Sequence, residues 1–278
     1  LLVYTDDLLV IGLNPRDVLR KVDKYFKLKP ESITEPDVYL GAKIRKVRVD
    51  TDTYAWAQSS AGYVKEAIKT AEKWCMENGF RLPTKAKTAI SPTYRPELDV
   101  SEVLAPDAAK WYQGAIGVLR WANELGRVDI MTEVSMLASQ MVQPRIGLLM
   151  AVLQCFAYLK QQHNARLVHD PRDPVIDQSK FPRENWKEFY GEIHETIPDN
   201  SPPPRGKPVI VSLWVDADHA GDKLTRRSQT GYLLYIQRSL IIAKSKKQAG
   251  VEGATFGAKF SAMKTAAEEN RALRYKLQ

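Results

Sequence analysis

The chain has 278 residues, of which 44% are hydrophobic, 27% charged and 9% aromatic. This composition is ordinary for a globular protein and excludes a disordered chain, a collagen-like repeat or a disulfide scaffold. The formal net charge is +8. Residues 1–200 hold 27 basic and 27 acidic side chains, whereas residues 201–278 hold 14 and 6. Because the whole surplus lies in the last part, a polyanionic partner is expected there, with a solvated basic surface as the alternative.

The cysteines and the apolar runs bear on compartment and membrane. Cys75 and Cys155 lie in apolar helical patterns, which is typical of reduced core thiols in an intracellular protein. The histidines are scattered and there is no C-x-x-C motif, so no His/Cys metal cluster is expected. The longest apolar run, residues 146–159, is too short for a bilayer, and no signal peptide is visible. No membrane partner is expected, and the opening without Met suggests a piece of a longer protein.

The first elements are two hairpins. Apolar residues 1–4 and 8–11 flank Thr5-Asp6-Asp7, which predicts a β-hairpin with acidic residues at its tip. A short amphipathic helix is expected over residues 16–26. Strands are then expected over residues 39–49 and 54–58, followed by a helix that is capped by Ser59 or Ser60 and ends at Asn78-Gly79.

The rest of the chain alternates between helical and strand-like segments. Three helices are expected, over residues 108–125, 130–142 and 146–162. Residues 198–208 hold five prolines in eleven positions and are predicted to be a domain linker. Beyond it, strands over residues 209–214, 231–237 and 239–243 and a helix over residues 255–277 form an incomplete α/β unit. The fold class predicted for the whole chain is α/β.

The Tyr4-Thr5-Asp6-Asp7 segment is the sharpest chemical feature. Two adjacent carboxylates on a hairpin tip are ligands of the kind that Mg²⁺ prefers. The alternative is simple turn chemistry, because Asp is a favoured turn residue.

This segment resembles the Y-x-D-D active-site hairpin of reverse transcriptases, in the form carried by Ty1/copia-type retrotransposons. Residues 26–44 resemble the family's segment leading to the primer grip, with Tyr39-Leu40-Gly41 at its core. The start of the thumb and two later blocks of the family match in the same order at residues 58–63, 112–130 and 157–160.

A second part of the resemblance lies beyond the proline-rich segment. W-V-D-A-D-H-A-G-D, R-R-S-Q-T-G-Y and S-K-K-Q resemble the opening of the family's ribonuclease H domain. Asp216 matches the first metal-binding acid of that domain. The family's S-T-E-A-E-Y aligns with residues 255–260, where Gly257 and Lys259 stand in place of acids. A lysine there repels Mg²⁺, so ribonuclease H activity is not expected; Glu252, about one helical turn earlier, is the alternative acid.

The resemblance implies a domain order and an activity. The order is palm (1–53), thumb (54–105), helical connection (106–197), linker (198–208) and the first half of a ribonuclease H-like domain (209–278). The activity is RNA-directed DNA polymerisation, a two-metal nucleotidyl transfer with Mg²⁺. The implied catalytic and metal-binding residues are Asp6, Asp7 and Asp216, while Tyr39, Leu40 and Gly41 position the primer. A third palm acid belongs on a strand upstream of Leu1, so this chain alone is expected to be inactive.

The resemblance also implies partners and a compartment. The partners are an RNA or DNA template–primer, dNTP and the upstream and downstream parts of a polyprotein, in the cytoplasm, a virus-like particle or the nucleus. Five basic residues near Asp216 are predicted to contact the nucleic-acid backbone, with a solvated face as the alternative; they are Arg226, Arg227, Lys244, Lys246 and Lys247. Tyr54 and Trp56 alternate on a strand and either stack on nucleic acid or pack within the sheet.

Two rival functions stay open. The first is a non-catalytic nucleic-acid-binding relic of a retroelement, which Lys259 favours. The second is a decayed gene product without a selected role. If half of the palm is absent, apolar surface is expected to be exposed and the isolated chain to be poorly soluble.

Overall fold

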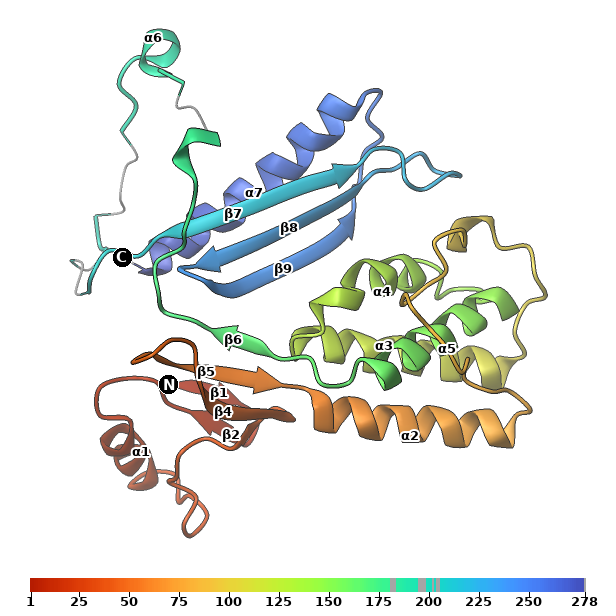
Figure 1. Cartoon of the computed structure of the whole chain (residues 1–278), viewed down its shortest axis with the longest axis horizontal. Helices are drawn as coiled ribbons and strands as arrows, with labels where there is room; N and C mark the ends of the chain where they lie inside the picture. Colours follow the sequence, from red (N-terminus) through yellow and green to blue (C-terminus); the bar gives the residue numbers. More distant parts are fainter. Residues whose placement is uncertain (181–183, 195–198, 202, 204–205, 278) are drawn as a thin grey trace. The chain divides into compact units, whose positions relative to one another are not determined.

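The computed structural model describes residues 1–180, 184–194, 199–201, 203 and 206–277. Helices and antiparallel sheets are mixed along the chain, which confirms the α/β class at that level (Figure 1). The chain divides into two compact units, Leu1–Val168 (unit 1) and His169–Gln278 (unit 2). Within the described ranges, none of the helices has the length and apolar character needed to cross a membrane.

The first hairpin of unit 1 is tighter than expected. β1 (Leu2–Tyr4) pairs antiparallel with β2 (Asp7–Leu9), and Tyr4 lies opposite Asp7. Thr5, at φ +53°, and Asp6 form the turn. The expected strand over residues 8–11 therefore starts at Asp7 and ends earlier, because a two-residue turn suffices to reverse the chain.

The surface around this hairpin is apolar. α1 (Pro15–Asp23) follows it and contains no buried residue. The large exposed side chains of this region include Leu2, Val3, Tyr4, Leu13, Tyr25 and Phe26. The expected exposure of apolar surface is confirmed.

A four-stranded sheet follows in the order β3-β4-β5-β6. Its strands are β3 (Val38–Tyr39), β4 (Ala42–Arg48), β5 (Tyr54–Ser59) and β6 (Leu167–His169). The single strand expected over residues 39–49 is wrong, since the chain reverses at Leu40 (φ +53°) and Gly41 (φ +86°). Two consecutive residues with positive φ are the mark of a tight hairpin turn.

Four helices form the core of unit 1. They are α2 (Ala61–Glu77), α3 (Pro106–Glu124), α4 (Met131–Ala138) and α5 (Ile146–Gln161). Short 3₁₀ helices, η1 (Pro96–Leu98) and η2 (Val128–Ile130), precede α3 and α4. The helix expected over residues 130–142 is shorter because Ser139 turns back: its amide and hydroxyl both donate to the Met136 carbonyl. As predicted, Cys75 and Cys155 are buried and not disulfide-bonded.

Unit 2 is a three-stranded antiparallel sheet with one long helix (Figure 1). Its elements are β7 (Val211–Asp218), β8 (Gln229–Ile236), β9 (Ser239–Lys247) and α7 (Thr255–Leu277). η3 (Gln178–Lys180) and α6 (Lys187–Tyr190) precede the sheet. Ala258 and Ala262 of α7 pack against Ala217, because small side chains let the helix approach the sheet closely. Each strand is longer than expected, so Asp216 lies inside β7.

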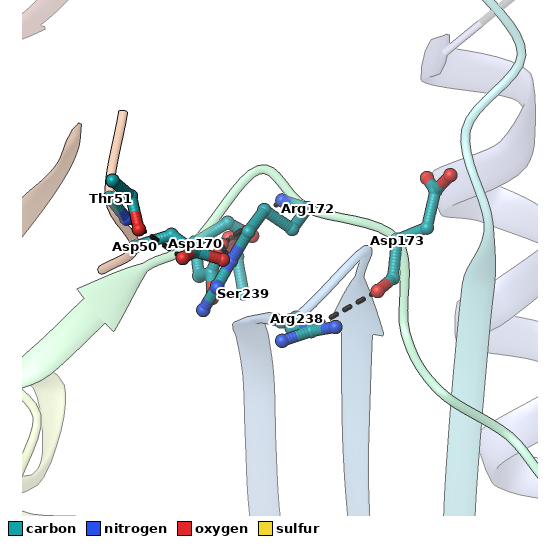
Figure 2. A network of polar contacts seen from close by, with 7 residues as sticks. All are labelled: Asp50, Thr51, Asp170, Arg172, Asp173, Arg238 and Ser239. Atoms are coloured by element: carbon teal, nitrogen blue, oxygen red, sulfur yellow. Dashed lines mark hydrogen bonds and ion pairs between the residues drawn. The ribbon is translucent and has the colours of Figure 1, made fainter. Parts of the chain in front are cut away.

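The start of unit 2 is held by a polar network (Figure 2). The Arg172 guanidinium donates to both oxygens of the buried Asp170 carboxylate, at 2.6–3.1 Å, and holds its pKa below the usual value. Ser239 Oγ donates to the Asp170 carbonyl at 3.0 Å, and Arg238 Nε to the Asp173 carbonyl at 2.8 Å. These contacts join residues 170–173 to the β8–β9 turn.

The division between the units accordingly falls before the proline-rich segment. The break lies between Val168 and His169, whereas the predicted linker is residues 198–208. Of that linker, residues 198, 202, 204 and 205 lie outside the described residues. Its role as a linker stays a prediction.

Candidate functional site

Two exposed carboxylates lie at the tip of the β1–β2 hairpin. Asp6 is in the turn and Asp7 is the first residue of β2. The hairpin is anchored through the Tyr4 ring, whose centroid lies 6.1 Å from that of Trp121 on α3. In the part of the chain that the structure describes, no three His, Cys, Asp or Glu side chains gather in a metal-binding group. The hairpin therefore supplies two carboxylates of the kind that suits a hard cation, and not a complete set of ligands.

The Tyr39-Leu40-Gly41 segment forms the β3–β4 turn near the same helix end. A Cβ atom added to Gly41 would lie 3.9 Å from Leu125 Cδ1, at ordinary van der Waals distance. Leu125 is the C-terminal cap of α3, one turn beyond Trp121. Two segments that are more than thirty residues apart in sequence thus meet the C-terminal end of α3 at consecutive turns.

In unit 2, Asp216 is paired with a lysine. Lys259 Nζ on α7 lies 2.9 Å from Asp216 Oδ1 on β7. The hydrogen bond from Lys259 lowers the pKa of Asp216. Both side chains are more than half exposed, so the pair contributes little to stability. Its importance is electrostatic, because an ammonium group occupies the position beside Asp216 where a metal ion would need room.

Glu252 lies next to the other position at which an acid was expected. A Cβ atom added to Gly257 would lie 2.6 Å from Glu252 Oε2, closer than real Cβ contacts allow. The Glu252 carboxylate therefore reaches the space above Gly257, and its backbone carbonyl lies 3.0 Å from His219 Nε2. With Lys259 on Asp216, these acids do not make a donor set that fits a divalent ion.

Asp222 is a structural acid of the β7–β8 loop. Its carboxylate accepts hydrogen bonds from the amides of Leu224 (3.1 Å) and Thr225 (2.7 Å) and pairs with Lys247. Burial opposes ionisation, but the hydrogen bonds from Lys247 and Thr225 outweigh it and lower the pKa to about 2. These contacts make Asp222 a turn acid that holds its own loop.

The predicted backbone-contacting residues fall into two groups. Lys247 is paired with Asp222, and Lys244 lies 2.7 Å from Glu269. The other three side chains are exposed, and among the described residues they show no ion pair; they are Arg226, Arg227 and Lys246. In the strand register, Asp218 pairs with Gln229 and Gln229 pairs with Lys247. The 221–228 loop and the end of β9 therefore lie at the same end of the sheet as the end of β7.

Arg127 is a buried polar residue for which the sequence predicted no chemical role. Arg127 is fully buried and donates to both Asp129 oxygens, at 2.9 and 2.7 Å. Its guanidinium carbon lies 6.0 Å from the centre of the Tyr158 ring. The R-x-D spacing in residues 127–129 was the only signal for this contact. A bidentate ion pair of this kind, with its guanidinium buried, fixes the turn between α3 and α4.

Comparison of the chain with protein-family models, with curated proteins and with solved structures finds no match in any of the three.

Proposed function

We propose that this chain is part of a retroelement reverse transcriptase, a palm–thumb–connection segment followed by a ribonuclease H-like unit. The observation that supports this most is that the hairpin, through Tyr4, and the Tyr39–Gly41 turn, through Gly41, both approach the C-terminal end of α3. An enzyme that extends a primer needs its acids and its primer-positioning segment close together. The proposal places the chain in the cytoplasm, a virus-like particle or the nucleus.

In this function Asp6 and Asp7 are metal ligands and Tyr39, Leu40 and Gly41 hold the primer strand. The two acids would hold Mg²⁺, which would activate a primer 3′-hydroxyl and stabilise a leaving pyrophosphate. The exposed, adjacent carboxylates suit the ion, and a further acid is needed from outside the described residues. The chain's own contribution is to hold two adjacent carboxylates at a hairpin that contacts α3 through Tyr4 and Trp121.

The mass of the native product tests this proposal. An antibody raised against a peptide of residues 186–197 would be used on lysate of the source cells. A band far above 31.5 kDa that incorporates dNTP on a primed RNA template supports the proposal. A band near 31.5 kDa with no incorporation contradicts it and favours a binding function.

A second candidate is non-catalytic nucleic-acid binding by unit 2. The Lys259–Asp216 contact favours it, because the acid is neutralised while Arg226, Arg227 and Lys246 stay exposed. The expected behaviour is binding to an RNA–DNA hybrid in EDTA, without cleavage when Mg²⁺ is added. The variant R226Q/R227Q should lower the salt dependence of binding by about 1.8 in log–log slope, 0.9 for each phosphate contact. Cleavage of the hybrid by the wild-type chain would contradict this function.

A further inference from the structure

The β4–β5 hairpin carries two aromatic rings and two cations on one face. Its register pairs Lys46 with Trp56 and Arg48 with Tyr54, without a bulge. Directly paired residues share a face, as do residues two apart along a strand. Lys46 Nζ lies 5.0 Å from the centre of the Trp56 ring. These four residues, Lys46, Arg48, Tyr54 and Trp56, are called the aromatic face below.

The burial of β5 shows that these rings are not core residues. Tyr54 is 63% and Trp56 36% exposed, whereas Ala55 and Ala57, which alternate with them, are 5% and 1% exposed. The strand thus turns its small residues inward and its large aromatic residues outward. If the rings served only to pack the sheet, the opposite alternation would be expected. Of the two interpretations open from the sequence, packing within the sheet does not describe these side chains.

We infer that the aromatic face binds single-stranded nucleic acid, with bases stacked on Tyr54 and Trp56 and phosphates paired with Lys46 and Arg48. Exposed rings interleaved with cations are the usual means of holding single strands, because every base has a π-face. This site involves neither the acids of the first hairpin nor Asp216. It therefore goes beyond the proposed function and can fail or succeed separately from it.

The spacing of the rings selects single strands over duplex. Residues two apart in a strand are separated by about 6.8 Å. Neighbouring bases along one strand of a duplex are about 3.4 Å apart, which is half that distance. Two bases that stack on both rings must therefore be drawn apart from each other, which an unpaired strand allows.

The local charges leave room for phosphate. Residues 42–59 hold four basic side chains, Lys43, Arg45, Lys46 and Arg48, against Asp50 and Asp52 at the turn. Lys46 lies 3.5 Å from Glu35, and both side chains are more than half exposed. Such an exposed pair holds its partners weakly and exchanges readily for a phosphate. Arg48, which pairs with Tyr54 across the hairpin, donates to the carbonyls of Asp50 and Thr51, and these are neutral acceptors.

Fluorescence anisotropy with labelled oligothymidylate of about 12 nucleotides, within the usual range of site sizes, tests the inference. The whole 278-residue chain would be used, at fixed salt. Loss of one ring in Y54A or W56A should raise the Kd about 5- to 150-fold. The ring-preserving variants Y54F and W56F should stay within about threefold of wild type, since stacking needs only the ring. Y25A and W186A, which remove exposed rings elsewhere, are the matched controls.

The cations have their own readout. K46Q/R48Q should lower the log–log salt slope by about 1.4, at 0.7 for each phosphate contact of a single strand. Circular dichroism spectra that match wild type show that each variant is folded. The inference is overturned if folded Y54A and W56A bind the oligonucleotide with the wild-type Kd, or if Y25A or W186A weakens binding as much as they do. It is also overturned if a duplex of the same length binds as tightly and its affinity falls equally in Y54A and W56A. Failure here with an active polymerase would leave the proposed function standing.

Discussion

The acidic hairpin of unit 1 and the first strand of unit 2 each carry an acid that the sequence predicts to bind metal, but the two differ in their surroundings. Asp6 and Asp7 are exposed, and within the described ranges they have no ion-pair partner. Asp216 is also exposed, yet Lys259 lies against it at 2.9 Å. The first site is open to a cation from solution, whereas the second already has one from its own helix. A sequence motif identifies the carboxylate that could bind a metal ion. The charged residues next to that carboxylate in the folded chain determine whether it is available.

The largest expected effect is a difference in dNTP incorporation between variants of the acidic hairpin and a variant of Asp216. Under the proposed function, D6N/D7N should lower dNTP incorporation by the native product by more than about 10³-fold, because it would remove ligands of a metal that stabilises the transition state by several kcal/mol. D216N should leave incorporation within about twofold. Steady-state incorporation on a primed RNA template measures both. Equal losses in the two variants would remove the distinction between the sites.

Within unit 2, the buried acid should matter more for stability than the exposed one. The pKa of Asp222 is about 2 in the folded chain, against 3.8 for the ordinary group. A lowered folded-state pKa stabilises the fold above pH 4, and this stabilisation is lost as the pH falls from about 4 towards 2. D222N should therefore lower the free energy of unfolding by about 2 kcal/mol at pH 7. The loss of stability between about pH 4 and pH 2 should become smaller in this variant.

D216N is the matched control for stability. Its pair with Lys259 is exposed, so its loss should cost at most about 1 kcal/mol. Urea unfolding at pH 7, 4 and 2.5 measures both variants. A cost of D216N as large as that of D222N would show that exposure does not separate these acids.

The smallest effect concerns the metal itself. K259E should replace the ammonium group by a carboxylate near Asp216 and Glu252 and so create a weak Mg²⁺ site. At a Mg²⁺ concentration about ten times the Kd, the melting temperature should rise by about 3–8 °C. Both chains, with and without K259E, carry D6N/D7N, which removes the acidic hairpin as a second Mg²⁺ site. Without K259E this chain should show no rise, and K264E, at an exposed lysine further along α7, is the control. A rise of the same size without K259E would mean that Lys259 does not exclude the ion.

The sequence predicted the elements well where periodicity governs, and less well where single residues decide. α7 and the long helices follow the apolar spacing, and Asn78-Gly79 ends α2 with Gly79 at φ +75°. The break at Leu40-Gly41 was missed because a leucine at positive φ leaves no mark in a pattern of apolar residues. The contact of Asp170 with Ser239, which assigns residues 169–197 to the later unit, joins residues 69 apart and leaves no pattern in the sequence.

For the candidate site, the sequence identified residue types but not their partners. The resemblance set Lys259 at a position where an acid is expected, and the structure puts its ammonium 2.9 Å from the Asp216 carboxylate. That Lys247 and Lys244 are held by Asp222 and Glu269 was not foreseeable, because each pair is 25 residues apart and depends on the register of β9 and the packing of α7. Charge can be counted in a sequence, but which charges neutralise one another is decided by tertiary structure.

The two buried thiols of unit 1 make the opening of its helical core measurable by chemical modification. Cys155 is fully buried, its Sγ donates to the Ala89 carbonyl at 3.0 Å, and burial raises the pKa of its thiol, so the reactive thiolate is scarce while the core is closed. Cys75 lies near the end of α2, where fraying needs less of the core to open. An alkylating reagent would therefore mark Cys75 and Cys155 at different rates, and the ratio would report how much of the unit opens together.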